Sequence, residues 1–117
     1  REELDLFIAR NYIDAALRAR LEKLIELRSS IIQTRGKLES FNEEVESIGG
    51  DQKRLRENIE ALAKTPEAKT LIARYIAKAN EQESRLEQIE KDKKTMASEK
   101  ERLERELATE IKNFEVR

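Results

Sequence analysis

The chain has 117 residues, of which 42% are charged and only 4% are aromatic. This composition is typical of coiled coils and long helices, and it leaves too few large apolar residues to fill a round core. Histidine and cysteine are both absent, which excludes Ser-His-Asp and Cys-His nucleophilic sites and zinc sites built on thiolates or imidazoles. We therefore expect no enzyme activity, no catalytic residue, no cofactor and no metal site.

The two charge types nearly balance, with 24 basic and 25 acidic residues for a formal net charge of −1. Lysine and arginine alternate with glutamate along the chain rather than gathering into the basic stripe of a nucleic-acid binder. No apolar run approaches the roughly 20 residues that are needed to span a bilayer. Neither nucleic acid nor a membrane span is expected, and no compartment is indicated.

Residues 1–11 are predicted to form a short lead-in segment. Leu4, Leu6, Phe7 and Ile8 make an apolar cluster there, and Asn11 followed by Asp14 resembles a helix-capping signal. The chain begins at Arg1 rather than at a methionine, so we expect it to be a fragment of a larger protein.

The first long helix is predicted over residues 12–63. Its evidence is a series of positions spaced alternately by three and four residues, in which ten of twelve residues are apolar against about 4.6 expected by chance. A stripe with this period is a coiled-coil seam. The series is Leu24, Leu27, Ile31, Thr34, Leu38, Phe41, Val45, Ile48, Gln52, Leu55, Ile59 and Leu62.

A hairpin turn is predicted at residues 64–67, followed by the second long helix at residues 66–114. Pro66 would disrupt a helix interior but suits a first helical position, and Thr65 before it is a favourable N-cap. A second heptad series from Ile72 to Phe114 has nine apolar residues among thirteen positions. Because so short a connection favours antiparallel neighbours, the predicted fold is an all-α, antiparallel two-helix coiled-coil hairpin.

Two features of the hairpin stay open at this point. Gly49-Gly50 could interrupt the first helix, although the heptad phase continues unchanged across it and favours one helix with a local bend. The register is also ambiguous. In an antiparallel pair the numbers of two facing residues add up to a constant, and constants of 134 and 127 both place apolar residues opposite each other. The first choice sets Gln52 against Gln82 as a polar pair in the core that would fix the register.

Four large apolar residues near the open end of the hairpin lie outside both seams. Leu21 and Ile111 occupy e positions, and Ile25 and Ile32 occupy b positions, so the apolar arc widens to one side near the open end of the hairpin. A two-stranded seam has no use for these side chains, which we interpret as a partner surface. The expected cover is the Leu4–Ile8 segment folded back over it, a second copy of the chain in a homodimer, or another domain of the parent protein.

Several segments resemble the helical region of uncharacterised bacterial proteins similar to mucoidy inhibitor A, which combine a β-rich domain with a coiled coil. The segments that carry this resemblance are 7–13, 51–59, Arg74-Tyr75 and 82–87. The resemblance spans about residues 7 to 110, although Gly49-Gly50 departs from the bulkier residues expected there. It implies a bacterial origin and no known catalytic activity, and it assigns no site residue.

The function that these observations favour is a structural and interaction module, a helical hairpin that spaces or oligomerises its parent protein. The alternative is a gripping arm that binds a client protein or RNA, as in the helical arm of seryl-tRNA synthetases or the tentacles of prefoldin. A tRNA-binding arm would need its basic residues on one face, whereas here they are interspersed with glutamate.

Overall fold

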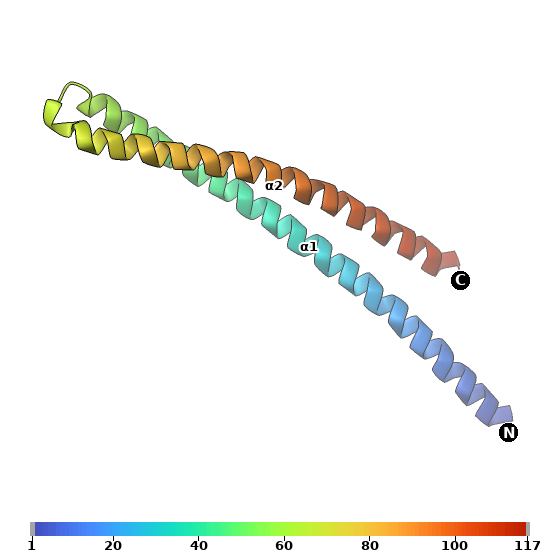
Figure 1. Ribbon diagram of the computed structural model, residues 1–117. Helices are drawn as coiled ribbons and strands as arrows, with labels where there is room; N and C mark the ends of the chain where they lie inside the picture. Colours follow the sequence, from blue (N-terminus) through green and yellow to red (C-terminus); the bar gives the residue numbers. More distant parts are fainter. Residues whose placement is uncertain (1, 117) are drawn as a thin grey trace. The chain divides into compact units, whose positions relative to one another are not determined.

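The computed structural model describes the backbone of residues 2–116 and the side chains of residues 14–115. Two long helices, α1 (Glu2–Leu62) and α2 (Lys69–Val116), are joined by a short turn and the 3-10 helix η1 (Pro66–Ala68) (Figure 1). No strand occurs in the described backbone. The predicted all-α antiparallel hairpin is therefore confirmed.

Helix α1 begins earlier than the sequence suggested. It runs without interruption from Glu2 through the Asn11–Asp14 region, so the expected boundary between a lead-in segment and a helix starting at residue 12 is wrong. No proline or glycine precedes Gly36, so the chain before Asn11 can be helical, and a helix that continues through Asn11 needs no N-cap there. The side chains of Leu4, Phe7 and Ile8 lie outside the described residues. The backbone alone shows that this segment extends α1 instead of folding back.

Helix α1 also continues through Gly49-Gly50, as the unbroken heptad phase predicted. Neither glycine has a positive φ, so neither adopts the left-handed conformation of a helix C-terminus. A Cβ atom added at either position would meet nothing within 4 Å. The glycines are thus tolerated in a solvent-facing part of the helix and are not required by close packing.

The turn lies where it was predicted, but it is built differently. The amide of Thr65 donates to the carbonyl of Leu62 at 2.9 Å, and the amide of Ala68 donates to the carbonyl of Thr65 at 3.0 Å. Thr65 occupies the predicted N-cap position before Pro66, in an extended conformation, but its side chain makes no capping hydrogen bond. Pro66 starts a 3-10 turn, and the α-helical pattern begins only at Lys69, because the chain must first tighten to reverse its direction.

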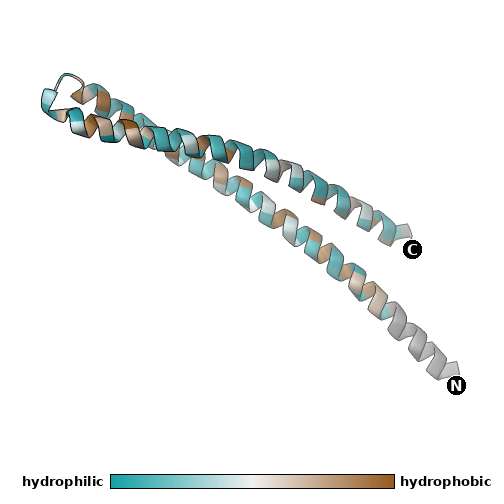
Figure 2. Ribbon diagram, viewed as in Figure 1, coloured by the Kyte–Doolittle hydropathy of each residue, from teal (hydrophilic) through white to brown (hydrophobic). Residues whose placement is uncertain are grey.

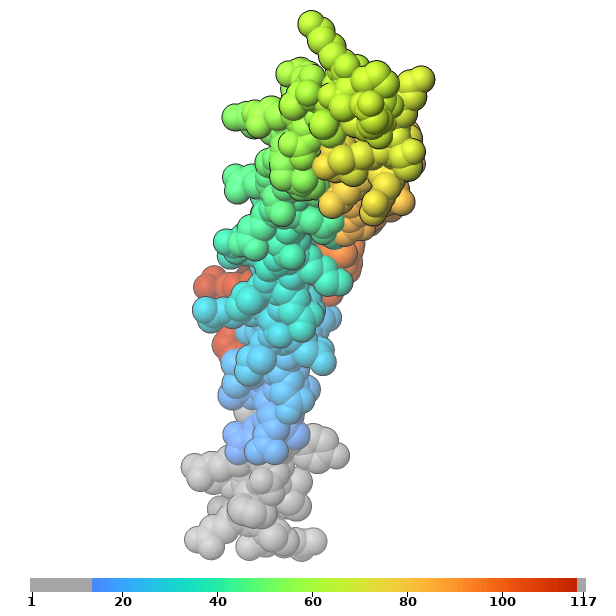
Figure 3. Space-filling model, turned by 90° about the vertical axis from the view of Figure 1, so that its left-hand side faces the viewer, coloured from blue at the N-terminus to red at the C-terminus, as the bar shows by residue number. Residues whose placement is uncertain are grey.

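The chain divides into two compact units, which we describe separately. Unit 2 comprises Gly36–Ala97 and contains the turn with the two helical segments that flank it. Leu55 of α1 and Ile89 of α2 are its fully buried side chains. Figure 3 shows the turn end of unit 2 as a continuous surface, with α1 in green beside the start of α2 in yellow.

Unit 1 comprises the part of α1 up to Arg35 and the part of α2 from Ser98 onward. Its core is a cluster of Leu27, Ile31 and Leu103, against which Leu107 packs. The burial of the two heptad series can be compared along both helices. All residues of the second series are at least partly buried, and in the first series Val45 alone is exposed. The alternation of apolar and polar residues that produces this pattern is visible along both helices in Figure 2.

The register follows the first of the two alternatives. Ile31 packs with Leu103, and their numbers sum to 134, whereas the other alternative would set Ile31 against Met96. In unit 2, Gln82 is hydrogen-bonded to Asp51, one residue from the Gln52 that this register sets opposite it. Both units therefore follow the same register.

Candidate interaction groove

The four predicted surface residues lie together on one groove of unit 1. Leu21, Ile25 and Ile32 of α1 and Ile111 of α2 all line a hollow of about 700 Å³. Their exposed fractions are 44%, 67%, 57% and 42%. Side chains of this size are more often buried, so an exposed cluster of them makes this groove a candidate interaction surface.

Helix geometry explains why these residues converge. In an antiparallel pair the e positions of both helices border the same side of the seam, and the b positions lie just outside them. Leu21 and Ile111 are at e, and Ile25 and Ile32 are at b. The floor of the groove is formed by the seam residues Leu24, Ile31 and Leu107.

The groove also contains charged side chains that the sequence analysis did not assign to it. Arg28, Arg35 and Glu104 line its wall together with Ala108. Arg35 Nη2 lies 3.7 Å from Glu104 Oε1 and links the two helices across the groove. Arg35 and Glu104 occupy e positions, so the heptad pattern could have placed both beside the groove. The sequence analysis did not find them because it considered apolar residues only.

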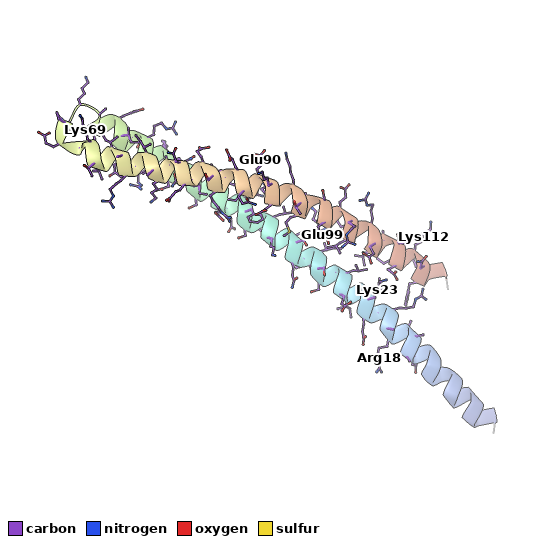
Figure 4. All side chains as sticks on the ribbon, viewed as in Figure 1. Arg18, Lys23, Lys69, Glu90, Glu99 and Lys112 are labelled. Carbon is purple, nitrogen blue, oxygen red and sulfur yellow. The ribbon has the colours of Figure 1, made fainter. Side chains whose placement is uncertain are left out.

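The opposite flank of unit 1 is polar. Lys23, at a g position, forms an ion pair of 3.1 Å with Glu110, which was a polar exception in the second heptad series. Arg20 donates a hydrogen bond of 3.4 Å to the Asn113 carbonyl, and its guanidinium lies 5.6 Å from the centre of the Phe114 ring. One side of unit 1 is thus closed by polar contacts, and the other presents the groove. Figure 4 shows the side chains of this unit, with Lys23 labelled on α1 and Lys112 on α2.

The two core glutamines do not bond to each other. Gln52 Nε2 donates to Glu83 Oε1 at 2.8 Å, and Gln82 Nε2 donates to Asp51 Oδ2 at 2.6 Å. Each glutamine thus reaches a carboxylate on the facing helix. Gln82 Oε1 is buried without a hydrogen-bond partner. The polar layer of unit 2 is therefore made of two glutamine–carboxylate bonds.

Asp51 is the centre of this polar layer. Besides the bond from Gln82, it accepts a hydrogen bond of 2.9 Å from Arg54 and lies 3.5 Å from Lys78 Nζ. The Arg54 bond, followed by the Gln82 bond, holds the pKa of Asp51 below its ordinary value. Two turns away along α1, Glu44 accepts two hydrogen bonds from Arg85, at 2.6 and 2.9 Å, which lower the pKa of the Glu44 carboxyl.

Within the described residues, no three carboxylates gather closely enough to hold a metal ion. None of the described helical residues form a stretch both long and apolar enough to cross a membrane.

Comparison of the chain with protein-family models, with curated proteins and with solved structures gives no match.

Proposed function

We propose that this chain is a non-catalytic interaction module, which serves as a spacer or oligomerisation element of a larger bacterial protein. The observation that carries the proposal is the apolar groove of unit 1. Ile25 and Ile32 take no part in the core of the hairpin, yet both are large, apolar and exposed. Leaving them in water is costly, and covering each of them is worth roughly 1.5–3 kcal/mol.

The residue inventory supports a non-catalytic role. The chain lacks histidine and cysteine, and its arginines near carboxylates form ion pairs along the helices, as Arg102 does with Glu99 and Glu106. Such pairs solvate and support a helix surface. The resemblance to the helical regions of proteins similar to mucoidy inhibitor A agrees with a bacterial parent protein that carries further domains.

The proposed function predicts that another part of the assembly covers the groove in the parent protein, and thiol labelling measures whether solvent reaches it. A thiol introduced by Ile25→Cys should react with a maleimide reagent much more slowly than a thiol introduced by Gln33→Cys, which is exposed at a c position two turns further along α1 and does not line the groove. The chain has no cysteine of its own, so each rate reports one position. Equal rates in the folded parent protein would show an uncovered groove and contradict the proposal.

A further inference from the structure

The two walls of the groove carry opposite charges. Between residues 18 and 35, the e and b positions of α1 hold only apolar and basic residues, namely Arg18, Leu21, Ile25, Arg28, Ile32 and Arg35. Between residues 97 and 115, the same positions of α2 hold only apolar and acidic residues, namely Ala97, Glu101, Glu104, Ala108, Ile111 and Glu115. The surface is therefore complementary to itself when α1 meets α2.

We propose that the groove is covered by a second copy of this chain, with the two unit 1 hairpins side by side and their helices pointing the same way. A two-fold axis parallel to the helices then packs α1 of each copy on α2 of the other. The inference rests on the proposed function and names the partner. The product is a local four-helix bundle in which all adjacent helices are antiparallel, a common and closed arrangement.

The register determines which residues meet across this interface. Residue i of α1 lies level with residue 134 − i of α2, and a two-fold axis along the helices keeps the levels unchanged. Ile25 is then level with the second copy's Ala108 to within one residue, and Leu21 with its Ile111 to within two. One residue corresponds to about 1.5 Å along a helix, so these apolar side chains are within reach of each other.

The charged residues match at the same levels. Arg18 lies level with the second copy's Glu115 to within one residue, and Arg28 with its Glu104 to within two. Arg35 lies level with Glu101 of the second copy to within two residues. At the outer rim, the f position Glu22 is level with the second copy's Lys112. Every charged e and b residue of α1 between 18 and 35 thus meets an opposite charge.

The reversed packing places like charges together. If the two hairpins pointed in opposite directions, α1 would pack on α1 and α2 on α2. The arginines at the e and b positions of α1 would then meet a surface whose charged e and b residues are all basic, and the glutamates of α2 would meet one whose charged e and b residues are all acidic. Opposed like charges at an interface suppress that mode of association. The charge distribution therefore selects the arrangement in which both hairpins point the same way.

Cross-linking in the 117-residue chain tests both the partner and the arrangement. Wild-type chain should sediment at twice 13.7 kDa at tens of micromolar. In a mixture of Ile25→Cys and Ala108→Cys chains, mild oxidation should give a disulfide-linked dimer of the two variants. Thr109→Cys is the matched control, because it neighbours Ala108 but occupies a c position that points away from the groove. Equal cross-linking with positions 108 and 109, or none with either, would contradict the arrangement.

Charge reversal gives a second test that does not depend on cysteines. Arg28→Glu with Arg35→Glu, and separately Glu101→Arg with Glu104→Arg, should each raise the dissociation constant at least tenfold while circular dichroism stays that of a helix. Mixing the two variants should restore association. Reversing the charges of Glu99 and Glu106, which lie on the opposite flank, should change the dissociation constant of the dimer less than twofold. If each groove variant dimerises as well as the wild type, the interface is wrong.

The outcomes separate this inference from the proposed function. A chain that stays at 13.7 kDa overturns the second copy as partner. If the thiol at position 25 is still protected in the parent protein, the interaction module stands with another domain as its cover. If that thiol is unprotected as well, both proposals fail.

Discussion

Gln82 donates a hydrogen bond of 2.6 Å to Asp51, and the adjacent Gln52 donates one of 2.8 Å to Glu83. The two bonds run across the same layer of unit 2 and join both helices at one level. Shifting the register by one heptad would separate every one of these partners by about 10 Å. Both registers align the apolar residues of the two helices almost equally well. The polar layer is therefore the feature that distinguishes the observed register, with a sum of 134, from the alternative with a sum of 127.

Replacing both glutamines by leucine should make the hairpin more stable but less specific for one register. Gln52→Leu with Gln82→Leu adds apolar contacts and removes the unpaired Gln82 Oε1, so unfolding should cost roughly 1–2 kcal/mol more. The polar preference for one register is lost at the same time. Spin labels at the exposed positions 47 and 87 should then report two distances instead of one. A single distance would show that apolar layers alone determine the register.

Removing the glycines should stabilise α1. Because nothing lies within 4 Å of a Cβ atom at Gly49 or Gly50, Gly49→Ala with Gly50→Ala should raise the free energy of unfolding by up to about 2 kcal/mol. Urea denaturation measures the change. Gly36→Ala is the matched control, since its Cβ would also meet nothing within 4 Å, and it should give about half that gain. A loss of stability in the double variant would indicate a role for the glycines that packing does not show.

Acid should weaken the hairpin. Hydrogen bonds from Arg85, Arg54 and Arg102 lower the pKa of Glu44, Asp51 and Glu99 below their ordinary values of 4.5, 3.8 and 4.5. The unfolded chain therefore binds protons more readily, and stability from these bonds is present above those ordinary values. It is lost as the pH falls through the lower pKa values of the folded state.

The pH effect can be assigned with a single variant. Glu44→Gln keeps the shape of the side chain but cannot titrate, so urea midpoints measured between pH 7 and pH 2 should fall less steeply than in the wild type. Glu57→Gln, on an exposed part of the same helix, is the control and should leave the slope nearly unchanged. If both variants change the slope equally, the Arg85 bond does not contribute in solution.

RNA should not bind this chain with the salt dependence of a gripping arm. Lys23, Arg35, Lys78 and Arg85 each lie within ion-pair distance of a carboxylate, so phosphate contacts would have to displace existing partners. A mobility-shift titration with a structured RNA should show no retardation at moderate salt. Retardation that weakens steeply with added salt would favour the gripping-arm function instead.

The heptad patterns predicted the fold, the seam residues and the position of the turn, because helix periodicity and a lone proline are local signals. They did not predict that α1 starts at Glu2 or that Thr65 leaves its cap unmade. Those details depend on small local energy differences. Groove residues such as Ile25 were identifiable as apolar positions outside the seam. Arg35 and Glu104 occupy e positions on the same side of the seam, but a search restricted to apolar residues left them out.

The core of unit 2 should be sensitive to truncation in proportion to burial. Leu55 is 1% exposed and Ile89 is 0% exposed, so Leu55→Ala and Ile89→Ala should each lower the free energy of unfolding by about 2–5 kcal/mol. A two-helix layer can partly collapse around a cavity, which places the expected values near the lower end of that range. Ile76→Ala is the control in the same unit. Its side chain is 47% exposed, and it should cost less than about 1 kcal/mol.

Equilibrium denaturation in urea measures all three variants, provided that the slope of the transition is unchanged. Equal costs at positions 55, 76 and 89 would mean that Ile76 is covered in solution by contacts beyond one hairpin. A small cost at positions 55 and 89 would mean that the helices separate easily near the turn. A large cost there and a small one at position 76 is the result that the burial of Leu55 and Ile89 predicts.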